Sequence, residues 1–379
     1  MTTHETHSAM NAVQAAVIAA TVMSIATITC VHARDHSTAD PPYYALRVIT
    51  PSSSVDSFTP TSISPSGIIT GRMRTGSTHT AFTWHNGAVT QYTAPSWGHT
   101  IVPNSLAVND RGAVVGALES VTKSRPFYAD PTVGLIEIDP LGTRYGTAYD
   151  ISSTGRIVGQ ARSPLDPEYV VPFVWQNGQG VELPIPLGFE SGVASTINDI
   201  GVIGGWVTLD REYPAQWDKD GLSILPIPIG HRSARIVSLD NSQRSIGFAL
   251  SNDAQRTTAM LWRPTFEPVM LSGLGGASST ALAINEQGLI VGSAQRADGT
   301  FAATLWINGH AWDLSMHLTL QPDVHVHRAV GIDAYGRIVA IARVGEHDNV
   351  AVLLRPVPAP SAGVVAMVCL CGCVARRRR

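Results

Sequence analysis

Cysteine is almost absent from this chain of 379 residues, and the four that occur lie at its ends. Cys30 is near the N-terminus, whereas Cys369, Cys371 and Cys373 belong to an apolar segment at the C-terminus. No disulfide framework can therefore stabilise the long stretch between them. In an apolar segment, the Cys-x-Cys-x-Cys spacing indicates small hydrophobic residues or lipid attachment sites more than a metal site.

Charged side chains are also scarce, at 15% of the sequence, and only Lys123 and Lys219 are lysines. The formal net charge of -3 excludes the basic surface that nucleic acid or an anionic membrane would need. No Gly-x-Ser-x-Gly, phosphate loop, His-Glu-x-x-His or EF-hand calcium loop occurs. The sequence therefore predicts no cofactor and no nucleic-acid partner.

The sequence instead contains a repeated segment. Its clearest copy is Ile284-Asn285-Glu286-Gln287-Gly288-Leu289-Ile290-Val291-Gly292, an apolar residue before a polar turn that ends on glycine, then a second apolar run. The apolar residue four positions before the turn glycine marks each copy: Ile63, Val108, Ile151, Ile197, Leu239, Ile284 and Ile332. Successive markers are 45, 43, 46, 42, 45 and 48 residues apart. A period of about 40–45 residues suits one four-stranded blade of a β-propeller.

The local chemistry of each copy predicts strands rather than helices. Asn or Asp followed by glycine favours a tight hairpin turn, and the short runs after it are rich in β-branched residues. Gln243 replaces the turn glycine in the fifth copy, and Ala340 replaces the closing glycine in the seventh. A third strand ends in tryptophan in five copies, which predicts a structural role and burial between blades for Trp84, Trp175, Trp217, Trp262 and Trp306.

The Ile-Asn-x-x-Gly-x-Ile-Val-Gly segment, followed by Ala-Phe-x-Trp at Ala81 to Trp84, resembles the extracellular HAF repeat of bacteria. The resemblance covers roughly residues 43–355, with the usual histidine before Ala-Phe shifted to His79. It implies an extracellular protein with a β-propeller fold, and it supplies no catalytic residues.

The ends of the repeat array predict how a ring would close. A lone strand, Tyr43 to Thr50, precedes the first copy, and the seventh copy stops after its third strand at Leu354. The first strand can complete the last blade and cover its exposed edge. We therefore expect one all-β domain over 43–355, a seven-bladed β-propeller closed by its N-terminal strand.

The loops predict a binding face. In an up-and-down blade, the two-to-three and four-to-one connections emerge on the same side, and these are the longer ones. The four-to-one loops carry the candidate binding residues Trp97, His99, Arg144, Tyr145, His231 and Arg232. The two-to-three connections add Arg72, Arg74, Asp166, Glu168, Asp210, Arg211, Arg296 and Asp298. Mixed charge with a few aromatics suits a polar ligand such as a glycan, although the same residues can simply be solvated.

Asp323, His325 and His327 form the sharpest candidate metal site. In an extended strand these three side chains point to one side, where one carboxylate and two imidazoles could hold an ion. The alternation with Val324 and Val326 is equally typical of an ordinary half-buried strand.

Both chain ends predict export. Residues 1–33 contain an almost continuously apolar or small stretch from Met10 to Thr29, followed by small residues near a possible cleavage point. This is typical of a secretory signal peptide, although no Lys or Arg precedes the apolar stretch; an uncleaved anchor is the alternative. A polar leader, 34–42, follows. Residues 356–379 comprise Pro358-Ala359-Pro360, an apolar stretch and Arg376 to Arg379, and they resemble the PEP-CTERM sorting signal. That resemblance implies a sorting protease and only transient membrane contact. We expect an exported protein of the cell envelope, the cell surface or the extracellular medium.

Two classes of function remain open from the sequence. One is a non-catalytic propeller that binds polysaccharide or another envelope or matrix component, envelope proteins included. The other is a secreted propeller enzyme acting on glycans, a hydrolase or lyase, with carboxylate pairs such as Asp210 and Glu212. Several carboxylates converging on the central funnel would favour the enzyme.

Overall fold

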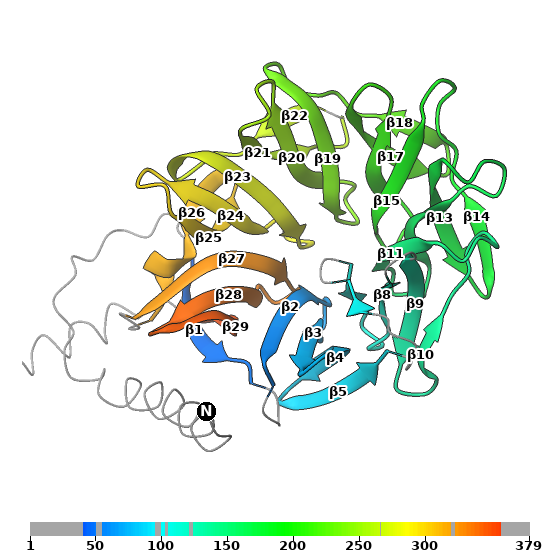
Figure 1. Cartoon of the computed structure of the whole chain (residues 1–379). Helices are drawn as coiled ribbons and strands as arrows, with labels where there is room; N and C mark the ends of the chain where they lie inside the picture. The colour runs from blue at the N-terminus through cyan, green and yellow to red at the C-terminus, as the bar shows by residue number, and fades with distance from the viewer. Residues whose placement is uncertain are drawn as a thin grey trace, which may run out of the picture.

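The computed structural model describes residues 41–50, 55–94, 100–102, 105–120, 124–265, 267–319 and 323–357. Seven antiparallel sheets surround a central axis, which confirms the predicted seven-bladed β-propeller (Figure 1). No α-helix occurs in these ranges, and one short 3₁₀ helix, η2 (Leu314–His317), precedes the last blade. Most of the predicted signal peptide and sorting signal lies outside the described residues. In the part of the chain that is described, no helix has the length and apolar character needed to cross a membrane.

The first three blades follow the order of the chain from the axis outward. Blade 1 contains β2 (Ser57–Ile63), β3 (Ile69–Thr75), β4 (Thr78–His85) and β5 (Ala88–Thr93). Blade 2 has an inner strand in two pieces, and it contains β6 (Thr100–Ile101), β7 (Ala107–Val108), β8 (Val114–Glu119), β9 (Ser124–Asp130) and β10 (Gly134–Glu137). Blade 3 contains β11 (Gly146–Ile151), β12 (Ile157–Arg162), β13 (Val170–Gln176) and β14 (Gln179–Glu182).

The next three blades repeat this order. Blade 4 contains β15 (Ser191–Ile197), β16 (Ile203–Thr208), β17 (Glu212–Asp218) and β18 (Gly221–Ile224). Blade 5 contains β19 (His231–Leu239), β20 (Ser245–Ser251), β21 (Thr257–Trp262) and β22 (Pro268–Met270). Blade 6 contains β23 (Gly275–Ile284), β24 (Ile290–Arg296), β25 (Phe301–Ile307) and β26 (His310–Asp313).

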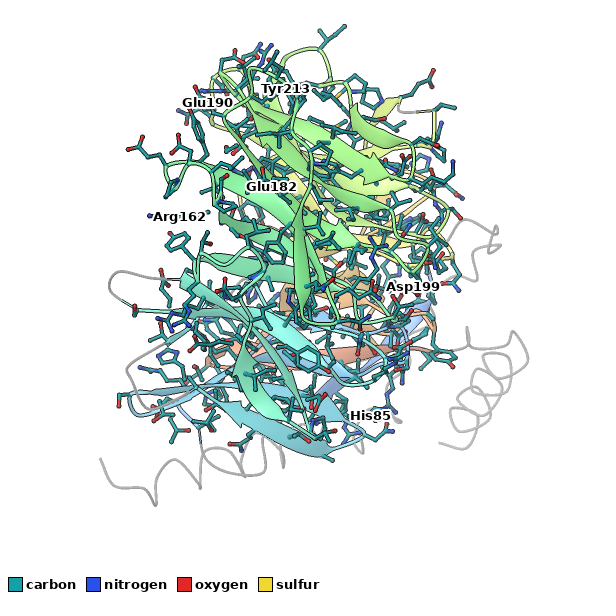
Figure 2. The ribbon with its side chains drawn as sticks, turned by 90° about the vertical axis from the view of Figure 1, so that its right-hand side faces the viewer. His85, Arg162, Glu182, Glu190, Asp199 and Tyr213 are labelled. Atoms are coloured by element: carbon teal, nitrogen blue, oxygen red, sulfur yellow. The ribbon has the colours of Figure 1, made fainter. Side chains whose placement is uncertain are left out.

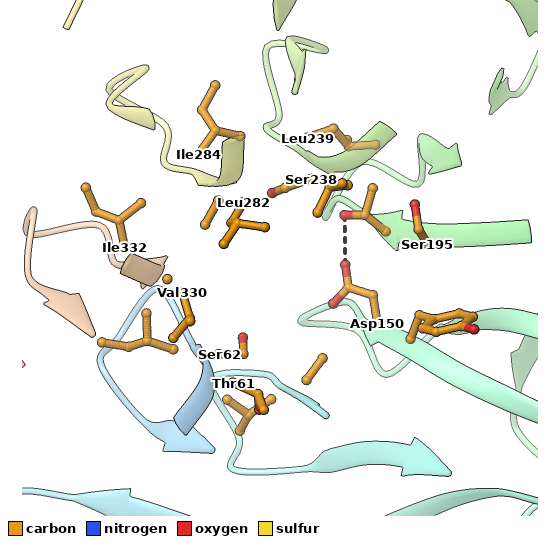
Figure 3. Close-up of a pocket in the computed structure, with 18 of the residues that line it drawn as sticks. Thr61, Ser62, Asp150, Ser195, Ser238, Leu239, Leu282, Ile284, Val330 and Ile332 are labelled. Atoms are coloured by element: carbon orange, nitrogen blue, oxygen red, sulfur yellow. Dashed lines mark hydrogen bonds between the residues drawn. The ribbon is translucent and has the colours of Figure 1, made fainter. Parts of the chain in front are cut away.

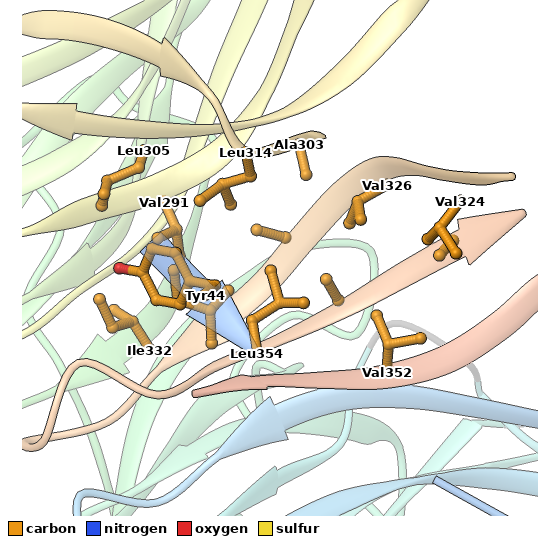
Figure 4. Packing of buried hydrophobic residues seen from close by; sticks show 14 of the residues in the cluster. Tyr44, Val291, Ala303, Leu305, Leu314, Val324, Val326, Ile332, Val352 and Leu354 are labelled. Atoms are coloured by element: carbon orange, nitrogen blue, oxygen red, sulfur yellow. The ribbon is translucent and has the colours of Figure 1, made fainter. Parts of the chain in front are cut away.

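Blade 7 joins the two ends of the described chain. Its first three strands are β27 (Val324–Ile332), β28 (Ile338–Val344) and β29 (His347–Val357), and its outer strand is β1 (Tyr43–Val48). β1 pairs antiparallel with β29 from Tyr43 opposite Val357 to Val48 opposite Val352. Tyr44 is fully buried in the apolar cluster between blades 6 and 7, against residues such as Val291 and Leu354 (Figure 4). The predicted closure by the N-terminal strand is confirmed.

Each inner strand carries a β-bulge two residues before its marker, blade 2 being interrupted there. The pairing skips Thr61 in β2, Ser195 in β15 and Leu282 in β23, and the same shift recurs in β11, β19 and β27. The bulge brings a backbone oxygen against the second strand. A Cβ added to Gly205 would lie 1.9 Å from the Val193 oxygen, so this position of the repeat requires glycine.

Three of the indole side chains tie blades 4, 5 and 6 to the segments that lead into them. Trp84 and Trp217 are 3% exposed, Trp262 and Trp306 are fully buried, and Trp175 is half-buried. The indole N–H groups of Trp217, Trp262 and Trp306 donate to the main-chain oxygens of Pro184, Pro226 and Ser272 at 2.8, 3.0 and 2.8 Å. These three bonds are equivalent in their blades, which explains why tryptophan recurs at this register.

The two faces of the disc carry different connections. The one-to-two and three-to-four turns lie on one face, which we call the turn face, and the other connections lie on the opposite loop face. Figure 2 shows this separation in side view, with Asp199 and His85 from turns on one side and Arg162, Glu190 and Tyr213 on the other.

Candidate functional site

A channel of about 700 Å³ runs along the axis, lined by the inner strands of all seven blades (Figure 3). The bulged residues contribute to its wall, among them Thr61, Ser195 and Leu282. The Ser195 hydroxyl donates to the Ile236 oxygen of the next blade at 2.7 Å, and Thr61 donates in the same way to Leu106 at 3.0 Å. No histidine, cysteine or lysine is among the described lining residues.

The motif asparagine forms the turn end of the channel by bonding in two directions. In blade 4, the Asn198 Oδ1 accepts from the Val202 backbone N–H at 2.8 Å, which closes its own turn. Its Nδ2 donates to the Asp240 main-chain oxygen of blade 5 at 2.9 Å. Asn109 and Asn285 make the same pair of contacts, reaching Ser152 and Asp333. One amide side chain supplies both the acceptor and the donor at this position, which a carboxylate cannot do.

Aspartate replaces the asparagine in blades 5 and 7, and an arginine four residues later supplies the missing donor. Asp240 caps its own turn at the Arg244 N–H, at 2.9 Å, and it pairs with the Arg244 guanidinium. Arg244 Nη2 then reaches the Glu286 main-chain oxygen of blade 6 at 3.0 Å. Asp333 and Arg337 repeat the arrangement toward Ser66 of blade 1. Asn alone, or Asp with Arg four residues on, therefore performs the same function.

Hydrogen bonds between turns cross every blade junction, so the turn end is a closed ring. Acidic side chains accept backbone N–H groups of the preceding turn: Asp110 from Ser66 at 2.8 Å, Asp199 from Ser153 at 2.8 Å, and Glu286 from Asn241 at 3.1 Å. The Ala334 N–H donates to the Pro65 oxygen at 3.2 Å and joins blade 7 to blade 1. The three carboxylates at this end thus stabilise the ring.

One carboxylate lies deeper in the channel wall. Asp150 of β11 accepts from the Ile151 N–H at 2.8 Å through one oxygen, and from the Thr196 hydroxyl and the Ile197 N–H, both at 2.9 Å, through the other (Figure 3). Burial is the main cause that raises the pKa of Asp150, and the hydrogen bonds oppose this shift. The side chain bridges blades 3 and 4.

Three arginines line the channel toward the loop face. Arg235 and Arg328 each lie four residues before their markers, and Arg72 pairs with Thr59, which is four residues before Ile63. These three residues, which we call the arginine mouth, therefore occupy one level of the channel. Arg235 stacks on the Trp206 ring at 4.6 Å and forms an ion pair with Glu212.

The other two arginines lack an acidic partner in the described chain. Arg72 Nη1 is 3.3 Å from His79 Nδ1 and 3.5 Å from the Ile101 oxygen. Burial, followed by the positive charge of Arg74, lowers the pKa of Arg72. The Arg328 guanidinium makes no hydrogen bond or ion pair with any described residue, and this residue is exposed.

Arg144, Tyr145, His231 and Arg232, the described candidate binding residues from the four-to-one loops, do not line the channel. Trp97 and His99 lie outside the described residues. Arg144 is exposed beside Asp139, and Tyr145 stacks under Arg162 at 4.4 Å. His231 Nε2 lies 3.0 Å from the Thr258 hydroxyl, and Arg232 is exposed at a bulge. Of the sequence candidates, Arg72 reaches the channel, and it does so from β3 rather than from a loop.

The described structure does not bring Asp323, His325 and His327 together as a group that could hold a metal ion. Among the described residues, no group of three or more His, Cys, Asp or Glu side chains could hold an ion. The pairing of β27 with β28 skips His327, so the strict alternation on which the hypothesis depended is broken there. Burial, the largest influence, lowers the pKa of His327.

Recurrent arginine positions in the sequence mark both the arginine mouth and the ring of turns. Arg235 and Arg328 share one register, and Arg156, Arg244 and Arg337 all lie five residues after their markers. Asp150 and Trp206 had no such recurrence, and they reach the channel from β11 and β16.

No protein-family model matches the sequence, and no curated protein matches it. Among solved structures, streptogramin B lyase is similar with a TM-score of 0.48 and 12% identity over 83% of this chain and 98% of that one. The β-propeller domain of the trilobed protease from Pyrococcus furiosus gives 0.47 and 10%, over 67% and 80%. A lectin from Aleuria aurantia, bound to Fucα1-6GlcNAc, gives 0.37 and 9%, over 72% and 96%. At these identities the likeness concerns the fold, and no activity is carried over.

Proposed function

We propose that this protein is an exported, non-catalytic β-propeller that binds polysaccharide of the cell envelope or matrix at the loop-face mouth of its central channel. The observation that carries the proposal is the arginine mouth, which joins polar donors and the Trp206 and Phe248 rings on a rigid wall. Glycan sites need such convergent polar groups beside apolar rings.

The arrangement of carboxylates supports binding over catalysis. A glycosidase needs two carboxyl groups facing one bond, about 5–10 Å apart. Here Asp110, Asp199 and Glu286 hold backbone N–H groups of the turn ring, and both oxygens of Asp150 accept protein hydrogen bonds. Glu212 is engaged by Arg235, and Asp210 accepts from the Tyr213 hydroxyl at 3.0 Å. Each of these carboxylates already has a structural partner.

Export is the second part of the proposal, and it rests on the terminal segments of the sequence. The signal-like residues 1–33 would direct the chain across the membrane, and the arginines at 376–379 would stop the tail there until a sorting protease acts. Fractionation of the native host, with mass spectrometry of the mature termini, tests this. A cytoplasmic chain with Met1 and Arg379 intact would contradict it.

A glycan array tests the binding function. We expect the propeller, residues 41–357, to bind a defined set of polysaccharide fragments. Changing all three mouth arginines to glutamine should abolish that binding, whereas changing the ion-paired Arg256 of an outer loop should not. An array without any specific signal, or release of reducing sugar from the bound glycan, would contradict the proposal.

A further inference from the structure

The channel has a charge polarity along its axis. Its described lining contains three arginines and four carboxylates. The arginines lie together at the loop-face end, whereas Asp110, Asp199 and Glu286 belong to turns at the opposite end, and Asp150 lies between. A channel of this kind attracts an anion at one mouth and repels it at the other, and low-dielectric walls strengthen the effect.

Uncompensated charge distinguishes the arginine mouth from the turn end. Every acidic side chain of the turn ring accepts at least one hydrogen bond, and Arg235 is neutralised by Glu212. Arg72 faces a histidine and a main-chain oxygen, and Arg328 has no ionic partner among the described residues. These two guanidinium groups come from neighbouring blades, since β27 of blade 7 contacts β2 and β3 belongs to blade 1.

We infer that Arg72 and Arg328 bind carboxylate groups of an acidic polysaccharide, so that the ligand of the propeller is a polyuronate rather than a neutral glycan. This inference rests on the proposed glycan-binding function and specifies its ligand. A guanidinium binds a carboxylate through two parallel N–H donors, which a neutral sugar cannot match. The partial burial of Arg72 reduces the screening of that contact by salt.

Arg235 has a different role at the same level. Its guanidinium lies over Trp206 and pairs with Glu212, so this side chain forms a fixed part of the wall. A ligand that approaches from the loop face meets the two uncompensated arginines beside this wall. The acidic turn end disfavours the same ligand, so binding is confined to one face.

Affinity electrophoresis in native gels containing polygalacturonate, with dextran as the neutral polysaccharide, tests the inference. We expect the wild type to be retarded by polygalacturonate and not by dextran, with the retardation decreasing as salt is added. Arg72→Gln and Arg328→Gln should each weaken binding by about tenfold, in line with loss of one charge-assisted contact. Arg256→Gln, which removes a paired arginine from an outer loop, serves as the matched control and should bind like the wild type. Thermal melts of all variants confirm that they are folded.

The outcomes separate the inference from the function on which it rests. Equal retardation by dextran and polygalacturonate, or unchanged polygalacturonate binding by folded Arg72→Gln and Arg328→Gln, overturns the inference and leaves glycan binding intact. Retardation by neither polysaccharide, together with a silent glycan array, overturns the proposed function itself. Arg72→Lys and Arg328→Lys keep the charge, and full binding by these variants would refute the bidentate contact.

Discussion

In the turn ring, an asparagine can be exchanged for an aspartate with an arginine four residues later, and this exchange is the sharpest test of the fold. Asn285 is 6% exposed, and it bonds to the Leu289 N–H and to the Asp333 oxygen of blade 7, both at 3.0 Å. Asn285→Asp keeps the acceptor for Leu289 but removes the donor to Asp333 and adds a buried charge. A buried polar group left unsatisfied costs about 1–3 kcal/mol, and an unpaired buried charge costs about 3–5 kcal/mol. We therefore expect a loss of several kcal/mol of stability.

A second substitution should restore much of this loss. Blade 5 carries Asp240 with Arg244, and blade 6 has Leu289 at the position of Arg244. In the double variant Asn285→Asp, Leu289→Arg, the new arginine can pair with the new aspartate and reach a main-chain oxygen of the next turn near Ala334, as Arg244 reaches the Glu286 oxygen. Leu289→Arg alone should destabilise the fold, because Leu289 packs on the cluster between blades 6 and 7.

Unfolding by heat and by guanidinium, followed by tryptophan fluorescence, measures the stability of the two single variants and the double variant. Coupled neighbouring substitutions differ from additivity by about 0.5–3 kcal/mol, and we expect a favourable coupling of at least about 1 kcal/mol. Asn252→Asp is the control, because Asn252 is exposed and its side chain has no partner among the described residues. Strictly additive effects of the two changes would refute the view that Asn and the Asp–Arg pair are equivalent.

Four further outcomes are expected. Deleting residues 43–50 should lower the melting temperature and cause aggregation detectable by light scattering, because β29 becomes an open edge; an unchanged melt would contradict closure. Tyr44→Phe should be neutral or stabilise by about 1 kcal/mol in guanidinium unfolding, since the buried hydroxyl finds no partner in the described chain, and a marked loss would reveal one. Trp306→Ala should cost about 3–5 kcal/mol in the same assay, and a loss below about 1 kcal/mol would mean that this position is not part of the core. The raised pKa of Asp150 means that its folded form holds the proton more tightly than the unfolded chain, so stability falls as pH rises through that pKa. The melting temperature of the wild type, relative to Asp150→Asn, should therefore be higher in acid than at alkaline pH, and a constant difference would contradict the shift.

The repeat period predicted the fold because each copy of the motif is one complete blade. Marker spacing fixed the number of blades, and the spare strand at Tyr43 combined with the truncated seventh copy to predict closure. Both are consequences of chain length and strand count, which do not depend on side-chain detail. The hairpin turns could also be predicted from the sequence, since Asn109 and Asn285 occupy the capping positions that their turns require.

The candidate site was harder to predict, because it depends on which way side chains point. A bulge in each inner strand shifts the alternation by one residue, so a period-two reading cannot place Asp150 or Arg328. The same irregularity breaks the alternation at His327 on which the metal hypothesis depended. Arg72 was assigned to a loop, yet β3 extends to Thr75 and carries this side chain into the channel.

The pairing of Tyr43 with Val357 determines the orientation in which the molecule would be displayed. Both ends of the described chain leave blade 7 at the same corner, and β29 runs from the loop face to the turn face. Pro356 lies beside Gly336 of the seventh turn, where a Cβ added to the glycine would meet the proline ring at 3.9 Å, so this corner is on the turn face. A tether at either terminus therefore holds the disc by its turn face. In a protein tethered in this way, the arginine mouth would face away from the anchoring surface.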